Sequence, residues 1–96
     1  MTETHYRQNR EKIAERRIHD EVVLLPTTSE LGAMGQMLDL NATATRIWDL
    51  AREGASESEI ARVLVGEFDA PEPEIRADVR AVLDHLTTVG ALLKSE

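Results

Sequence analysis

The chain of 96 residues contains no cysteine. This absence excludes thiol catalysis, cysteine-based zinc sites and a disulfide framework, so packing alone must hold the fold together. The sequence also lacks an apolar N-terminal segment and any run long enough to span a membrane. A chain of this length makes one domain with a modest core. We therefore expect a soluble, cytoplasmic protein that has no contact with a membrane.

Positive charge is scarce and unevenly distributed. The chain carries 11 Lys and Arg against 18 Asp and Glu, a net charge of −7. Residues 1–20 are net +1, whereas the remainder is net −8. A body this acidic would repel phosphate backbones, so we expect no nucleic-acid partner. Residues 1–11 are polar and without period, and we expect a flexible N-terminal arm ahead of a folded domain at 12–96.

Groups that could carry catalysis are few. His5, His19 and His85 have no ligand spacing, and we expect them to be solvated surface residues. A serine nucleophile would need a positioned base, and a helix-capping role accounts for Ser56. The sequence has no phosphate-binding glycine loop. We therefore expect a protein that is not an enzyme and that holds no metal and no cofactor.

What the sequence does contain is a stretch in which a strand leads directly into a helix. Residues 37–40 form a short apolar segment that places Leu38 and Leu40 on one face. Asn41 follows, and asparagine is among the best N-cap residues. The next apolar residues recur at helical spacing: Ala44, Ile47, Trp48 and Ala51. Gly54 is then the glycine expected to end this helix.

The preceding sequence predicts two more strands. Residues 12–18 alternate imperfectly and favour a strand, although a frayed helix remains an alternative. A turn is expected at 19–21, and the β-branched run at 22–25 predicts a strand that ends at Pro26. Residues 27–35 are rich in Thr, Ser and Gly, which is typical of a hairpin loop.

The following sequence predicts two more helices. Ser56 and Glu59 have the spacing of a capping box, followed by an apolar stripe of Ile60, Val63, Leu64 and Phe68. The prolines at 71 and 73 mark the start of the third helix. Its apolar positions are Ile75, Val79, Val82, Leu83, Leu86 and Val89, and Gly90 ends it before an apolar tail at 91–93. The predicted fold is α+β and winged-helix-like, with a three-stranded antiparallel sheet followed by three helices (βββααα).

A winged-helix arrangement raises DNA binding as an alternative function. The helix over residues 75–89 would be the recognition helix. Its exposed positions are mixed and largely acidic: Glu74, Arg76, Asp78, Arg80, Asp84 and His85. DNA-reading helices carry Arg, Lys, Asn or Gln in a positive field. A small DNA-binding transcription regulator, contacting phosphates through its basic N-terminal arm, is therefore the second hypothesis.

The order of these residues resembles a known family. The run Leu38-x-Leu40-Asn41-x-Thr43-Ala44-x-x-Ile47-Trp48 is similar to the LN-x-T/S-A-x-x-I-W signature of PqqD-like proteins. Further similarities follow in order at Gly54, Glu59-Ile60, Leu64, Phe68-Asp69-Ala70-Pro71, Asp78-Val79, Leu83, Leu86 and Gly90. The resemblance covers residues 17–93. One departure is the segment at 26–36, which is longer than the usual hairpin of the family.

The resemblance implies a function. PqqD-like domains are recognition elements for ribosomally synthesised and post-translationally modified peptides. They bind the leader segment of a precursor peptide, which adds as a strand along the third strand beside the third helix. Stand-alone members act with a separate maturase, such as a leader peptidase, a cyclase or a radical SAM enzyme. Lasso-peptide and pyrroloquinoline quinone biosynthesis are examples, and Trp48 and the long hairpin segment favour a peptide natural-product pathway over quinone biosynthesis.

The same resemblance implies a set of peptide-binding residues, which are Met37, Leu38, Asp39, Leu40, Arg76, Val79, Arg80 and Leu83. The two arginines would pair with acidic leader residues. Equally, Val79 and Leu83 would be core residues, and Arg76 and Arg80 would form helical pairs with Glu72 and Asp84. The open third strand also leaves two oligomeric states possible, a monomer or an edge-paired dimer.

Overall fold

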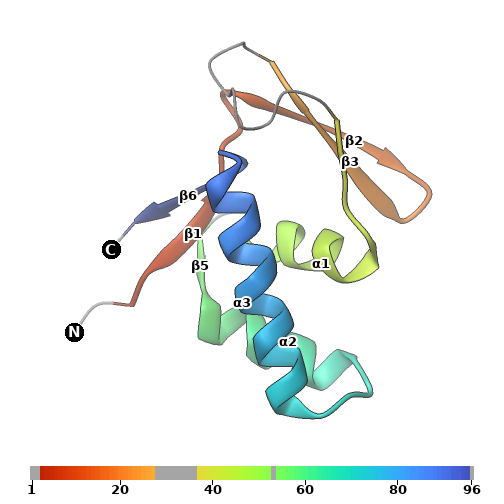
Figure 1. Cartoon of the computed structure of the whole chain (residues 1–96), viewed down its shortest axis with the longest axis vertical. Helices are drawn as coiled ribbons and strands as arrows, with labels where there is room; N and C mark the ends of the chain where they lie inside the picture. The colour runs from red at the N-terminus through yellow and green to blue at the C-terminus, as the bar shows by residue number, and fades with distance from the viewer. Residues whose placement is uncertain (1–2, 28–36, 53, 96) are drawn as a thin grey trace.

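The computed structural model describes residues 3–27, 37–52 and 54–95, and its fold is α+β as predicted. Two small antiparallel sheets accompany three helices (Figure 1). The elements in chain order are β1 (His5–Gln8), β2 (Ile13–Ile18), β3 (Glu21–Pro26), β4 (Leu38–Asp39), α1 (Ala42–Leu50), β5 (Ala55–Ser56), α2 (Glu57–Glu67), α3 (Glu72–Thr88) and β6 (Leu92–Ser95).

The first sheet, in the order β2-β3-β4, contains the three strands that the sequence predicts. Strands β2 and β3 form a hairpin whose register runs from Ile13 opposite Pro26 to Ile18 opposite Glu21. The hairpin turns at His19, which adopts the left-handed conformation with φ of 58°. Strand β4 adds two residues, because Asp39 lies opposite Val23 and Leu38 opposite Leu24. The predicted loop at 27–35 falls almost entirely outside the described residues.

The second sheet, in the order β5-β1-β6, corrects two expectations. Residues 5–8, expected to belong to a flexible arm, are strand β1 and pair with both β5 and β6. Residues 92 and 93, expected in an apolar tail, are the first two residues of strand β6. Tyr6 is 5% exposed, and Gln8 Nε2 donates to the Trp48 carbonyl at 2.8 Å. Strand β1 is therefore part of the packed fold, because its alternate side chains are buried.

Helix α1 begins as predicted and ends earlier than predicted. The Asn41 side-chain oxygen accepts from the Ala44 N–H at 2.8 Å, which caps the first turn. The helix ends at Leu50, and Ala51 is its C-cap. Gly54 does have a positive φ of 103°, but it lies three residues beyond the cap. There it turns the chain into β5 rather than ending α1.

Helices α2 and α3 each bury one face in the hydrophobic core. The predicted capping box of Ser56 and Glu59 is present at the start of α2. Val63 was expected on the buried stripe of α2 but is 37% exposed, and Ala61 is buried instead. Helix α3 buries Ile75, Val79, Leu83 and Leu86 at the spacing of one helical face. Gly90, with φ of 89°, follows it and turns the chain into β6.

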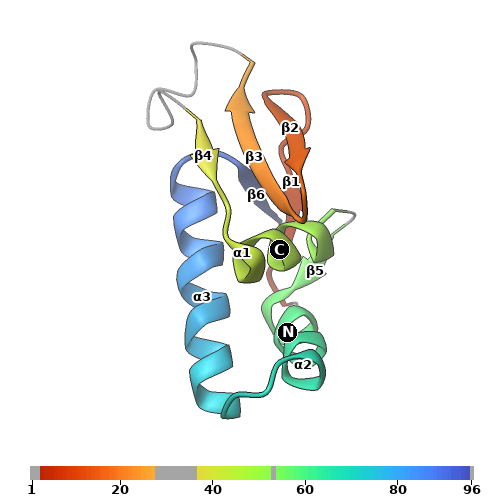
Figure 2. The ribbon, with the colours of Figure 1, turned by 90° about the vertical axis from the view of Figure 1, so that its right-hand side faces the viewer.

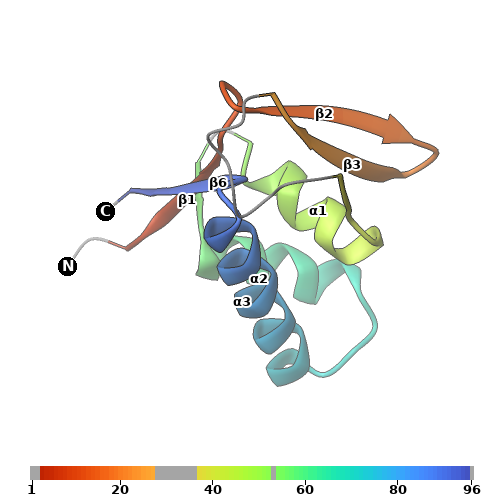
Figure 3. The ribbon, with the colours of Figure 1, turned by 45° about the horizontal axis from the view of Figure 1, so that its top comes forward.

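The core lies between the two sheets and the helices. Trp48 is its largest member, is 1% exposed and projects from α1. Figure 2 shows β4 running down to α1 beside α3, and Figure 3 shows the β2–β3 hairpin lying over α1. Among the described residues, no helix is both long and apolar enough to cross a membrane.

Candidate functional site

Strand β4 is an edge of the first sheet among the described strands. The Leu40 N–H, immediately after β4, donates to the Val22 carbonyl at 2.9 Å and so points into the sheet. Successive residues of a strand direct their backbone N–H and C=O groups to opposite sides. The backbone polar groups of Asp39 therefore point away from β3. This edge presents hydrogen-bonding groups that another strand can use.

A groove of about 300 Å³ lies between β4 and the C-terminal half of α3. It is lined by Leu38, Asp39, Leu40, Asn41, Ala44, Ala81, Val82, His85 and Leu86. Its floor is apolar, because Leu40, Ala44 and Leu86 are buried core residues. Leu38 and Val82 are partly buried and pack against them. Among the described lining residues, the exposed charged or titratable ones are Asp39 and His85.

The position of β4 depends on Thr45, a residue that the sequence analysis did not single out. Thr45 Oγ1 accepts from the Val22 N–H at 3.1 Å and donates to the Leu40 carbonyl at 3.2 Å. Thr45 is 4% exposed and belongs to α1. It therefore ties the end of β4 to β3 and to the first turns of α1. The spacing of apolar residues in α1 does not predict this role, because it marks Thr45 only as a polar residue of the helix.

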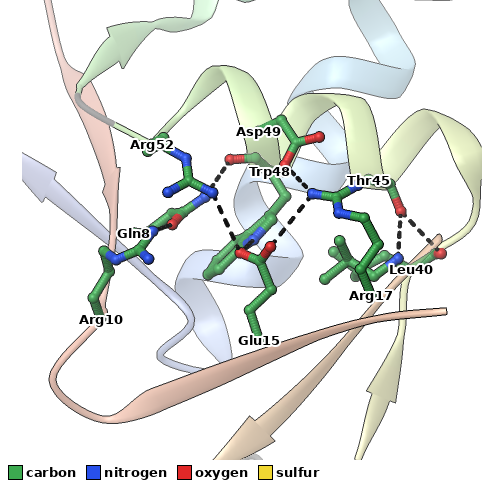
Figure 4. A network of polar contacts seen from close by, with 10 residues as sticks. Gln8, Arg10, Glu15, Arg17, Leu40, Thr45, Trp48, Asp49 and Arg52 are labelled. Atoms are coloured by element: carbon green, nitrogen blue, oxygen red, sulfur yellow. Dashed lines mark hydrogen bonds and ion pairs between the residues drawn. The ribbon is translucent and has the colours of Figure 1, made fainter. Parts of the chain in front are cut away.

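A second polar cluster joins the hairpin to α1 around Trp48 (Figure 4). Trp48 Nε1 donates to Glu15 Oε1 at 2.8 Å. Arg17 contacts Asp49 at 2.8 Å and Glu15 at 3.3 Å. Its hydrogen bond to Asp49 raises the pKa of the Arg17 guanidinium. These contacts fix how the hairpin crosses α1, and with it the place of the β4 edge.

The structure brings only part of the predicted site together. Leu38, Asp39 and Leu40 line the groove, and Met37 precedes β4 with 60% of its surface exposed. The four predicted positions on α3 do not line it: Arg76, Val79, Arg80 and Leu83. The groove instead uses the neighbouring positions Ala81, Val82, His85 and Leu86. The groove therefore lies against the helix that the prediction names, but at other positions of it, and peptide contact at the predicted residues stays a prediction.

The four displaced residues have other roles. Val79 and Leu83 are fully buried core residues, which was the alternative interpretation. Arg76 Nε lies 2.8 Å from Glu72, the expected helical pair. Arg80 contacts Glu57 of α2 at 3.1 Å rather than pairing with Asp84, and it lies beside Tyr6 on the flank away from β4. No group of three or more potential metal ligands occurs in the described ranges 3–27, 37–52 and 54–95.

Comparison with known proteins decides the family. The family model described as coenzyme PQQ synthesis protein D (PqqD) matches residues 21–92. The chain belongs to the PqqD family. The resemblance inferred from residues 38–48 is thereby confirmed, and the match runs from the start of β3 to the start of β6. Strands β1 and β2 lie outside it. No curated protein sequence matches this PqqD-family chain significantly.

Two solved structures are similar over nearly the whole chain. One is described as TbiB1 in complex with the TbiA(beta) leader peptide, with 29% identity and a TM-score of 0.75 over 90% of this chain and 93% of that chain. The other is lasso peptide synthetase B1 complexed with the leader peptide, with 25% identity and a TM-score of 0.75 over 92% of this chain and 96% of that chain. Both comparisons extend beyond the 21–92 match of the PqqD family.

Proposed function

We propose that this protein binds the leader segment of a ribosomally synthesised precursor peptide and delivers it to a separate modifying enzyme. The observation that carries the proposal is the open edge of β4 above an apolar groove. Two solved relatives with the same fold are described as complexes with leader peptides. A lasso-peptide pathway is the setting that these relatives support best.

Strand addition explains how an otherwise disordered leader would be held. The outward N–H and C=O of Asp39 would exchange hydrogen bonds with the leader backbone. Alternate leader side chains would then point into the groove, because side chains of a strand alternate between its two faces. There they would contact Leu38 on β4 and Val82 on α3. Ala44 and Ala81 carry small side chains, which leaves room for a larger side chain from the leader.

The groove favours apolar leader side chains over acidic ones. Its floor is formed by Leu40, Ala44 and Leu86, and none of the described residues that line it is an arginine or a lysine. Arg76 and Arg80, which would have attracted acidic residues, lie on the other flank of α3. The carboxylate of Asp39 stands at the rim. We therefore infer that apolar anchors of the leader supply most of the affinity and that an acidic side chain beside Asp39 weakens it.

The separate enzyme enters the proposal because the described residues offer no catalytic constellation. Their buried polar side chains, such as Gln8, Thr45 and Ser56, have structural hydrogen bonds. A leader peptidase, a cyclase or a radical SAM enzyme would supply the chemistry. The protein would hold the precursor close to that enzyme. A tethered substrate has a higher effective concentration at the enzyme than a free one.

The test is a fluorescence-anisotropy titration with labelled leader peptides from precursors encoded beside the protein. Asp39→Pro removes the N–H at the open edge and keeps the bonds to β3, since proline is tolerated where that N–H faces outward. Val82→Glu places a charge in the groove. We expect each change to weaken leader binding about tenfold or more.

The matched control is Arg80→Glu, which alters α3 on the flank away from the groove. We expect it to bind the leader as the parent does. Binding that is lost in Arg80→Glu and kept in both groove variants would refute the β4 site. Flat titrations with every leader, together with retention on duplex DNA, would favour the DNA-binding alternative instead.

A further inference from the structure

A basic pocket lies on the flank of the molecule away from β4. It has a volume of about 350 Å³, and its charged residues are Arg7, Arg10, Glu11 and Arg52. It shares no lining residue with the β4 groove. Figure 2 shows β4 beside α3 on one side of the molecule and β1 and β2 on the other. The two sites can therefore be occupied together.

The pocket is positively charged in a chain that is net negative. Three arginines face one glutamate there, whereas the whole chain carries −7. Within the part of the chain that the structure describes, Arg7 and Arg10 have no carboxylate at ion-pair distance. Arg52 reaches Glu15 only at 3.9 Å, the longest of the described ion pairs. Most of this positive charge is therefore not neutralised within the fold.

A buried glutamine holds Arg10 in the pocket that Arg52 also lines. Gln8 is 3% exposed and donates to the Trp48 carbonyl at 2.8 Å. Its side-chain oxygen accepts from Arg10 Nη1 at 2.6 Å, and Figure 4 shows Arg10 and Arg52 beside it. Like charges held close repel each other, and a carboxylate placed between them relieves that repulsion. Guanidinium groups also match the two oxygens of a carboxylate.

We propose that this pocket docks an Asp/Glu-rich segment of the separate modifying enzyme while the leader lies in the β4 groove. The proposal rests on the function proposed above and names where the enzyme binds. An acidic segment would be repelled by the rest of this chain and attracted here, which fixes the orientation of the complex. Arg7 and Arg10 lie outside the 21–92 match. Arg52 lies inside that match, so the pocket combines one family position with two arginines that precede the match.

The experiment uses the full chain and a labelled oligoglutamate peptide as the probe, read by anisotropy at low salt. Arg7→Ala/Arg52→Ala removes two charges of the pocket. Arg46→Ala/Arg62→Ala removes two charges elsewhere and is the matched control. We expect the pocket variant to weaken oligoglutamate binding about tenfold and the control to keep it within about twofold. Leader binding should be the same in all three proteins.

Three results would overturn the proposal. The first is equal loss in both double variants, which would mean that only net charge matters. The second is no oligoglutamate binding to the parent. The third is saturable binding of inorganic phosphate by the parent that blocks the peptide and is lost in the pocket variant, which would identify a small-anion site. The leader titration is separate, so oligoglutamate binding without leader binding would refute the proposed function and leave the acidic-segment site standing.

Discussion

At the scale of single residues, Thr45 decides where the groove begins. The chain leaves β4 at Leu40, so the Val22 N–H of β3 turns to a side chain for its acceptor. Thr45 Oγ1 fills that role and donates in turn to the Leu40 carbonyl. All three residues are buried. The Thr45 hydroxyl therefore bridges the Val22 N–H and the Leu40 carbonyl, which do not bond to each other directly.

Replacing Thr45 by Val keeps the shape of the side chain and removes its hydroxyl. We expect Thr45→Val to lower the free energy of unfolding by roughly 1–3 kcal/mol, because the buried Val22 N–H is left without an acceptor. Urea denaturation measures the change. Thr88→Val is the matched control, since Thr88 is exposed at the end of α3. Equal effects of the two changes would show that the Thr45 hydroxyl is dispensable.

At the scale of elements, the helix starts are set by local side chains. Ser56 Oγ accepts from the Glu59 N–H at 3.2 Å, and a Glu59 carboxylate oxygen accepts from the Ser56 N–H at 2.9 Å. The hydrogen bond from the Ser56 backbone is the main cause that lowers the pKa of Glu59. The bond from the Ser56 side chain and the charges of His5 and Arg62 act in the same direction. The start of α2 is therefore stabilised most when Glu59 is ionised.

This lowered pKa predicts a pH dependence. A carboxyl with a lower pKa in the folded state stabilises the fold above its unfolded pKa, and this contribution disappears as the pH falls through the folded pKa. Glu59→Gln keeps a capping acceptor without the charge. We expect the stability advantage of the parent over Glu59→Gln to be present at neutral pH. It should be lost as the pH falls through the lowered pKa of Glu59, which lies below the ordinary range of a glutamate. Unfolding in urea across a pH series measures this, and an advantage that grows on acidification would contradict it.

The elements also show what sequence can and cannot predict. The caps at Asn41 and Ser56 were predictable, because each is a local pattern of neighbouring residues. The apolar stripe of α3 was predictable too. Which flank of that stripe faces β4 was not, because it depends on how α3 packs under a sheet formed elsewhere in the chain. For that reason Arg80 was expected at the groove, although Val82 and His85 line it.

At the scale of the whole molecule, the two ends of the chain form one sheet. The Asn9 N–H donates to the Ala91 carbonyl at 2.9 Å, and the Asn9 side chain donates to the Gly90 carbonyl at 2.9 Å. Strand β1 has only four residues, and its buried side chains alternate with more exposed ones. Four residues are too few to show the two-residue period of a strand clearly in the sequence. A pairing between segments more than 80 positions apart therefore escaped sequence analysis. It places the basic pocket on one flank and the β4 groove on the other.

The most direct test of the central claim is amide hydrogen exchange of the protein with and without a saturating leader peptide. The Asp39 N–H points to the open edge of β4, and strand addition would give it an acceptor. We predict that leader binding slows exchange at Asp39 and leaves the outer edge of β6 unchanged. If exchange slowed along β6 and did not change at Asp39, the peptide would lie on the other sheet. That result would contradict the account.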